Sequence, residues 1–158
     1  MALDKTVNVK IAGIGGMGAL KAALILGEVM FAEGYDVKKA EVHGMSQRGG
    51  SVASDVRFGK EVVSPIIPEN SIDFLISLEP EWSDVHKISL AKGGVVISPN
   101  NIDIEKLPTK KALNVALLGV LSKYFDVPES RWFEVLKDLF PEKLHVSNET
   151  AFLLGRNS

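Results

Sequence analysis

The chain has 158 residues, of which 46% are apolar, and a formal net charge of −2 with acidic and basic residues interspersed. This length and composition suit one domain, residues 1–158. The interspersed charges form no basic cluster of the kind typical of nucleic-acid-binding proteins. No apolar run approaches the roughly 18 residues of a transmembrane helix, and residues 1–5 lack the apolar core of a signal peptide. We therefore expect a cytoplasmic protein that contacts no membrane.

The chain contains no cysteine. It cannot ligate an iron–sulfur cluster through thiolates, form a disulfide or use a thiol nucleophile, so electrons in any redox reaction must pass through a cofactor or another chain. The histidines at 43, 86 and 145 share no metal-ligand spacing, and we expect no metal site. No serine lies in a G-x-S-x-G elbow and no acidic pair is placed for acid–base catalysis, so we assign no catalytic residue.

Residues 7–12 read as a buried strand that runs directly into a glycine-rich turn, Gly13-Ile14-Gly15-Gly16-Met17-Gly18. Apolar residues then recur at helical spacing from Leu20 to Phe31, Gly34 suits a left-handed helix stop, and residues 37–42 form a second strand. This arrangement predicts a right-handed βαβ unit.

The first turn fits the G-x-G-x-x-G pattern between a strand and a helix, where backbone N–H groups can hold a phosphate. Glu41, near the end of the second strand, would supply the acid of a dinucleotide site. The alternative is that the glycines only permit close packing of the strand and the helix.

A second glycine-rich turn follows, Gly44-Met45-Ser46-Gln47-Arg48-Gly49-Gly50-Ser51. Its arginine can clamp a phosphate or a carboxylate in bidentate fashion, or form an ion pair at an interface. We expect both turns at the same edge of a parallel sheet, where α/β proteins build their sites. The candidate cofactor-binding residues are Gly13, Gly15, Gly16, Gly18, Ser46, Gln47, Arg48, Gly49, Gly50 and Ser51.

In residues 51–58 the alternation predicts a strand with one solvated face, which carries Ala53, Asp55 and Arg57. Gly59-Lys60 can turn into residues 61–64 to form a hairpin, and the two prolines after it favour an extended edge or loop. Residues 72–78 read as a central parallel strand, followed by a helix that opens at Pro80 and a short strand over 95–97.

Three further helices are predicted, after Thr109, after Pro128 and after Ser147, with the first and last of these residues as caps. The whole pattern predicts an α/β fold. We expect a Rossmann-like, mostly parallel sheet with helices on both faces and a helical C-terminal part.

The first turn, together with residues 41–51, resembles the gamma subunit or domain of the 2-oxoacid:ferredoxin oxidoreductases. Within that family the likeness is greatest to the beta-subunit type of indolepyruvate ferredoxin oxidoreductase. Residues 64–68, 114–119 and 148–155 fit the same family, so the resemblance covers nearly the whole chain. The second turn is its specific part, because the first is shared with many nucleotide-binding folds.

The resemblance implies a complex that oxidatively decarboxylates a 2-oxoacid, of pyruvate or indolepyruvate type, on thiamine diphosphate. The acyl group passes to coenzyme A and the electrons pass through iron–sulfur clusters to ferredoxin. This chain has no cysteine and no Gly-Asp-Gly thiamine signature followed by asparagine. We therefore expect an accessory, assembly or coenzyme A-contacting subunit that is inactive alone, binds thiamine- and cluster-containing subunits, and can self-associate as a homodimer when isolated.

Two departures accompany the resemblance. Met17 occupies a position where the family usually has glutamine, and residues 98–113 are shorter than the family segment, which usually adds a strand and a helix. Two other functions stay open at this point. One is a stand-alone NAD- or flavin-binding oxidoreductase that uses residues 13–18 and Glu41, and the other is a non-catalytic acyl-CoA-sensing module.

Overall fold

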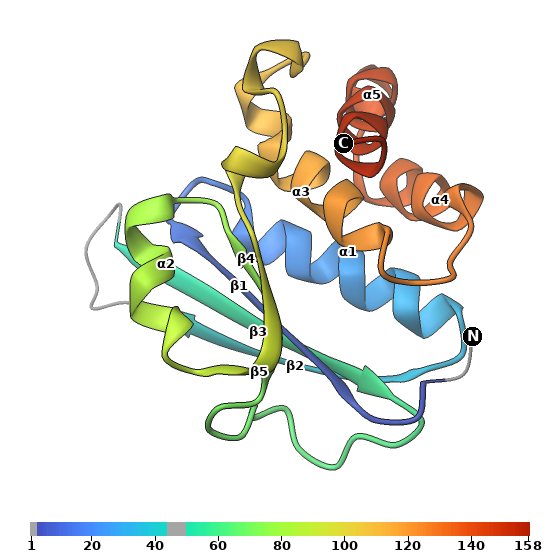
Figure 1. Ribbon diagram of the computed structural model, residues 1–158. Helices are drawn as coiled ribbons and strands as arrows, with labels where there is room; N and C mark the ends of the chain where they lie inside the picture. The colour runs from blue at the N-terminus through green and yellow to red at the C-terminus, as the bar shows by residue number, and fades with distance from the viewer. Residues whose placement is uncertain (1–2, 44–49) are drawn as a thin grey trace.

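The computed structural model describes residues 3–43 and 50–158. In chain order its elements are β1 (Val7–Ile14), α1 (Ala19–Ala32), β2 (Asp36–His43), β3 (Ser51–Gly59), β4 (Ile72–Ser77), α2 (Pro80–Lys87), β5 (Leu90–Ile97), the short 3-10 turns η1 (Pro99–Asn101), η2 (Ile104–Lys106) and η3 (Lys110–Ala112), α3 (Leu113–Ser122), α4 (Glu129–Leu139), η4 (Glu142–Leu144) and α5 (His145–Arg156). The predicted α/β fold with a helical C-terminal part is confirmed (Figure 1).

The five strands form one sheet in the order β2-β3-β1-β4-β5. β1 pairs with β4, and β4 with β5, in parallel, whereas β3 is antiparallel to both of its neighbours, β1 and β2. Four strands therefore run in one direction and β3 runs against them. The sheet is mixed, with two parallel and two antiparallel pairings, and β3 separates the two strands of the predicted βαβ unit.

Helices cover both faces of this sheet (Figure 1). α1 packs on β1, β2 and β3, while α2 packs on β4 and its neighbours. Two separate apolar cores reflect this arrangement: Ile11 and Ile76 belong to the larger one, on the α1 side, and Ala12 and Leu75 belong to the smaller one. Because successive residues of a strand point to opposite faces, these adjacent pairs show that both faces are buried.

Two local predictions about the segment after the second turn are wrong. Residues 61–64 form no strand, and the antiparallel hairpin is instead β2–β3, with the second glycine turn as its connection. The predicted strand forms as β3, but the face that we expected to be solvated is covered: Asp55 is only 8% exposed and Ala53 is 7% exposed. The reason is that the chain after β3 folds back over that face, where Ile67 packs against the core that contains Ala53.

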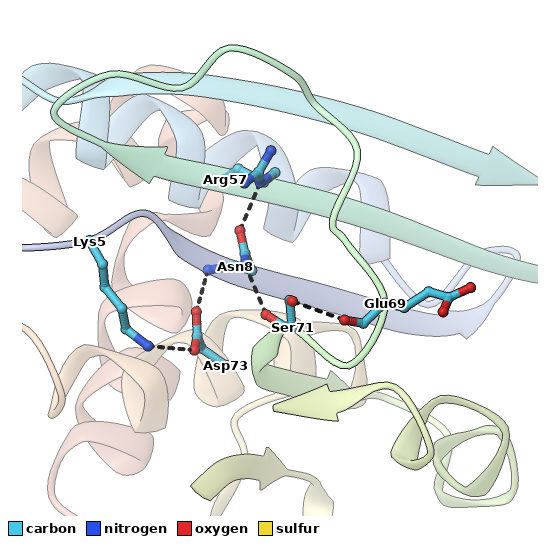
Figure 2. A network of polar contacts seen from close by, with 6 residues as sticks. All are labelled: Lys5, Asn8, Arg57, Glu69, Ser71 and Asp73. Atoms are coloured by element: carbon cyan, nitrogen blue, oxygen red, sulfur yellow. Dashed lines mark hydrogen bonds and ion pairs between the residues drawn. The ribbon is translucent and has the colours of Figure 1, made fainter. Parts of the chain in front are cut away.

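Residues 60–71, which we call the strap, run across the second face without forming a regular element (Figure 2). Arg57 of β3 donates to the carbonyl of Ser64 at 2.6 Å and to Oδ1 of Asn8 at 2.8 Å. Asn8 in turn donates through Nδ2 to the carbonyl of Ser71 at 2.9 Å. Side chains from two central strands thus hold the strap at Ser64 and at its last residue, Ser71, in place of the backbone pairing of a strand.

The strands and helices differ from their predicted limits at a few points. β5 begins at Leu90 and is longer than the predicted strand over 95–97. Ser147 does not cap the last helix, because α5 begins at His145 and the Ser147 hydroxyl donates back to the Leu144 carbonyl at 3.1 Å. Thr109 does accept from the N–H of Lys111, at 3.4 Å, and caps η3 directly before α3.

Candidate functional site

The first glycine turn joins the end of β1 to the start of α1. It closes through the N–H of Met17, which donates to the Ile14 carbonyl at 3.1 Å. Gly16 and Gly18 have φ values of 91° and 87°, in the left-handed region that residues with a Cβ rarely adopt. Gly15 and Gly16 are exposed, so the turn presents backbone to solvent at the N-terminal end of α1.

Met17 contributes its sulfur to the same turn. The N–H of Ile14 points at Met17 Sδ, at 3.4 Å. A thioether is a weak acceptor, but it is polarizable and fits irregular spaces. At the position where the resemblance leads us to expect glutamine, the methionine side chain therefore still provides an acceptor within the turn.

The first glycine turn meets the last two residues of the second, Gly50 and Ser51, at one edge of the sheet, as predicted. Ile14 is the register partner of Ser51, and Gly15 donates its N–H to the Gly50 carbonyl at 3.0 Å. The meeting depends on β3, since only an antiparallel neighbour brings its first residues to the last residues of β1. Ser46, Gln47, Arg48 and Gly49 lie outside the described residues, and their binding role stays a prediction.

Two hollows flank the first turn. One, of about 460 Å³, lies between Gly15, Gly16, Lys21 and Val52. The other, of about 440 Å³, is lined by Gly16, Met17, Gly18, Lys110, Lys111 and Leu113. The turn is therefore accessible from both sides, and its second hollow receives residues from a segment far along the chain.

Lysine side chains give this edge its positive charge. Lys110 and Lys111 are exposed on η3, and within the described part of the chain neither ammonium group pairs with a carboxylate. Lys21 differs, because it donates to the Leu139 carbonyl at 2.8 Å and lies 4.7 Å from the centre of the Phe140 ring. The exposed backbone of Gly16 beside these two ammonium groups can attract a phosphate or a carboxylate.

Sequence reasoning missed Lys110 and Lys111 as site residues. A pair of lysines next to a capping threonine gives only a local signal of a helix start. Their position beside Gly16 depends on the packing of the C-terminal helices against α1, which no local pattern reports.

The dinucleotide arrangement expected for Glu41 does not form. In such a site the second strand lies beside the first, which brings its terminal acid close to the glycine turn. Here β3 lies between β1 and β2, with Glu41 paired to Ser54 and Ser54 paired to Ile11. Two strand spacings, about 10 Å, therefore separate β2 from β1.

The histidines take structural positions where their side chains are described. His145 Nε2 lies 2.8 Å from the Phe140 carbonyl and 3.1 Å from the Lys137 carbonyl, at the end of α4. His86 of α2 lies near Lys10 and Asp55, whose ammonium and carboxylate groups are 2.6 Å apart. Burial of His86, followed by the charge of Lys10, lowers its pKa below the ordinary 6.5, while Asp55 acts in the opposite direction.

Residues 3–43 and 50–158 contain no group of three or more histidine or acidic side chains placed to hold a metal ion. No helix in the same part of the chain has the length and apolar character needed to cross a membrane.

Comparison with known proteins places the chain in a family. The family model described as pyruvate ferredoxin/flavodoxin oxidoreductase matches residues 8–158. The chain therefore belongs to the pyruvate ferredoxin/flavodoxin oxidoreductase family.

The indolepyruvate oxidoreductase subunit IorB of Thermococcus kodakarensis is 34% identical over 191 aligned positions, which cover 96% of this chain and 95% of that protein. This alignment is longer than the 158 residues of the chain, so the relative has residues with no counterpart here. The comparison does not place them, and the shortening expected at residues 98–113 stays a prediction.

Two solved structures share the fold. The gamma subunit of a keto/oxoacid ferredoxin oxidoreductase from Geobacter sulfurreducens superposes with a TM-score of 0.76 at 22% identity, over 96% of both chains. The 2-oxoglutarate:ferredoxin oxidoreductase from Magnetococcus marinus, solved with 2-oxoglutarate, coenzyme A and succinyl-CoA bound, superposes with a TM-score of 0.79 at 19% identity. That match covers 98% of this chain but 31% of the larger one. The same fold thus occurs both as a separate small chain and as part of a longer chain.

Proposed function

We propose that the chain is the small, gamma-type subunit of a 2-oxoacid:ferredoxin oxidoreductase complex that acts on a 2-oxoacid of pyruvate or indolepyruvate type. The observation that carries this proposal is the alignment with a named small subunit from end to end, over 96% of this chain and 95% of the relative. A match of that extent relates the whole chain, and not one motif, to a subunit of such a complex.

The composition fits a subunit without its own redox centre. No cysteine is present, so thiolate-ligated iron–sulfur clusters belong to partner subunits. Thiamine diphosphate, on which the 2-oxoacid loses carbon dioxide, belongs to a partner as well, because this chain has no thiamine signature. The chain is then inactive alone and acts as an accessory subunit in the assembled enzyme.

In that complex, the paired glycine turns contact coenzyme A or a neighbouring subunit. The exposed backbone of Gly16, together with the ammonium groups of Lys110 and Lys111, supports contact with a phosphate group of coenzyme A. The left-handed turn lets a ligand approach the backbone closely, because no Cβ stands in the way. These residues bind and orient; none of them is placed to take part in bond making.

Isolation of the tagged chain from its native host tests the subunit assignment. We expect a thiamine-containing chain and a cysteine-rich chain to co-purify through size-exclusion chromatography, and mass spectrometry would identify them. The isolated complex should reduce ferredoxin when supplied with coenzyme A and a 2-oxoacid, and a panel from pyruvate to indolepyruvate would define its preference. Recovery of this chain only with itself would contradict the proposal.

A pair of matched variants tests the contact with coenzyme A. Replacing Lys110 and Lys111 by alanine removes two positive charges beside the turn, whereas replacing Lys60 and Lys92, exposed elsewhere, removes the same net charge. In the complex, we expect the first variant alone to raise the KM for coenzyme A, by about tenfold if each exposed ammonium group contributes the roughly 0.7 kcal/mol of a surface ion pair. An equal KM in both variants would place the coenzyme A contact elsewhere.

A further inference from the structure

A buried side chain from the C-terminal half contacts the first glycine turn. Asn114, near the start of α3, donates through Nδ2 to the Gly18 carbonyl at 3.2 Å, across 96 residues of sequence. Asn114 is 6% exposed, and its Oδ1 accepts from the N–H of Val115 at 2.9 Å. The Gly18 carbonyl also accepts from the N–H of Ala22 at 2.9 Å, so this oxygen has two donors.

Gly18 and the Asn114 amide fit each other closely. A Cβ built on Gly18 would overlap Nδ2 of Asn114, and the φ of 87° at Gly18 already disfavours any side chain. The left-handed backbone turns the Gly18 carbonyl toward Asn114, and the absence of a Cβ leaves the space that the amide fills. The shape of the turn and the position of Asn114 therefore depend on one another.

The same contact aligns the second hollow. Asn114 directly follows Leu113, and Leu113, Lys110 and Lys111 line the hollow beside Gly16 and Gly18. A hydrogen bond from a buried amide to the turn therefore sets how far the lysine-bearing segment lies from the exposed backbone. Two segments that contact the same ligand bind it more tightly when they are already held in the correct relative position before the ligand arrives.

We propose that Asn114 is a positioning residue of the glycine-turn site: it holds Gly18 in its left-handed conformation and keeps the Lys110–Lys111 segment beside the turn. The inference rests on the proposed function only for the identity of the ligand, coenzyme A. Its structural part is tested on the full chain without ligand.

Hydrogen exchange of the full chain gives the direct test, with Asn148→Ala as the matched control for Asn114→Ala. Asn148 is also a buried asparagine, 5% exposed, on α5, and its Nδ2 has no hydrogen-bond partner among the described residues. We expect the amides of Met17 and Ala22 to exchange about fivefold faster in Asn114→Ala, the factor that one net hydrogen bond is worth, and to be unchanged in Asn148→Ala. Equal rates in the two variants would overturn the proposal.

Asn114→Asp keeps the test decisive if the alanine variant fails to fold. It retains the shape of the side chain but replaces the donor by an oxygen that faces the Gly18 carbonyl, so the same local acceleration is expected. A double-mutant cycle with Gly18→Ala adds a second readout. Because the new Cβ would meet the Asn114 amide, Gly18→Ala should destabilise the Asn114→Ala background less than the wild type, and strict additivity would contradict the contact.

Calorimetric titration with coenzyme A separates this inference from the proposed function. We expect Asn114→Ala to weaken binding by about fivefold or more and Asn148→Ala to leave it unchanged. If the wild-type chain binds no coenzyme A while the exchange result holds, the coenzyme A contact fails and the positioning role of Asn114 stands. Unchanged affinity in Asn114→Ala, with binding by the wild type, would overturn its role in the site.

Discussion

Gly119 of α3 and Gly155 of α5 each lie against the backbone of the opposite helix. A Cβ on Gly119 would overlap the Phe152 carbonyl, and a Cβ on Gly155 would overlap the Ala116 carbonyl. The two helices therefore approach more closely than any pair with side chains at the crossing could. This contact fixes α5 on α3, whose first turn carries Asn114.

Gly119→Ala should therefore destabilise the chain although alanine favours helices. We expect a loss of about 1–3 kcal/mol, the usual cost of adding a methyl group to a packed interior, measured by urea unfolding. Gly27→Ala in α1 is the control. Its Cβ would meet the flexible Lys39 side chain at 3.3 Å and Val37 Cγ1 at an ordinary contact distance of 3.6 Å, so stability should change by no more than about 1 kcal/mol. Equal stabilities of the two variants would contradict the close crossing.

Arg57→Ala should release the strap without unfolding the sheet. The variant loses the hydrogen bonds to Ser64 and Asn8, and a charged donor of this kind is worth about 1.5–3 kcal/mol. Hydrogen exchange should accelerate within residues 60–71 while α1 stays protected. Lys5→Ala removes the exposed 3.2 Å pair with Asp73 shown in the same network (Figure 2) and should cost less than about 1 kcal/mol. Unchanged exchange in the strap of Arg57→Ala would count against its anchoring role.

Stability should fall as the pH drops below about 6.5 because of His86. Burial and Lys10 lower its pKa in the folded chain, so the unfolded chain binds the proton more readily and gains free energy relative to the folded one. The stabilisation is complete above the ordinary pKa of 6.5 and is lost as the pH falls through the lower folded value. Urea unfolding between pH 7.5 and 5.5 should show a shallower decline in His86→Gln; parallel curves would exclude His86 as the cause.

Arg48→Ala and Arg48→Lys test the second turn, whose central residues lie outside the described part of the chain. If Arg48 clamps a phosphate or a carboxylate, both variants should weaken assembly or acyl transfer in the complex, since lysine lacks the planar fork. Thermal unfolding of the isolated subunit should stay unchanged. Normal turnover in a complex that contains Arg48→Ala would remove this residue from the site.

The elements around the site were predictable because their signals are local. The glycines at 13, 15 and 18 between an alternating strand and a helical apolar stripe define a strand–turn–helix, and Gly34 has the φ of 94° expected of a left-handed helix stop. The predicted hairpin is wrong because strand pairing is not a local property. Gly59-Lys60 has suitable turn residues, but the strand pairing partner of β3 is β2, and pairing is a long-range property.

By itself, the sequence determined the α/β class, the two glycine turns at the ends of strands, the lack of any cysteine-bound redox centre and the family resemblance. These features follow from residue type and short-range periodicity. Only the tertiary structure decided that β3 separates Glu41 from the first turn, that Lys110 and Lys111 reach that turn, and that Asn114 binds Gly18. Each of these three features is a contact, or a separation, between segments that are far apart in the sequence. Such contacts are set by which helix and strand faces pack together and by which polar groups then need a hydrogen-bond partner, and no local pattern specifies either.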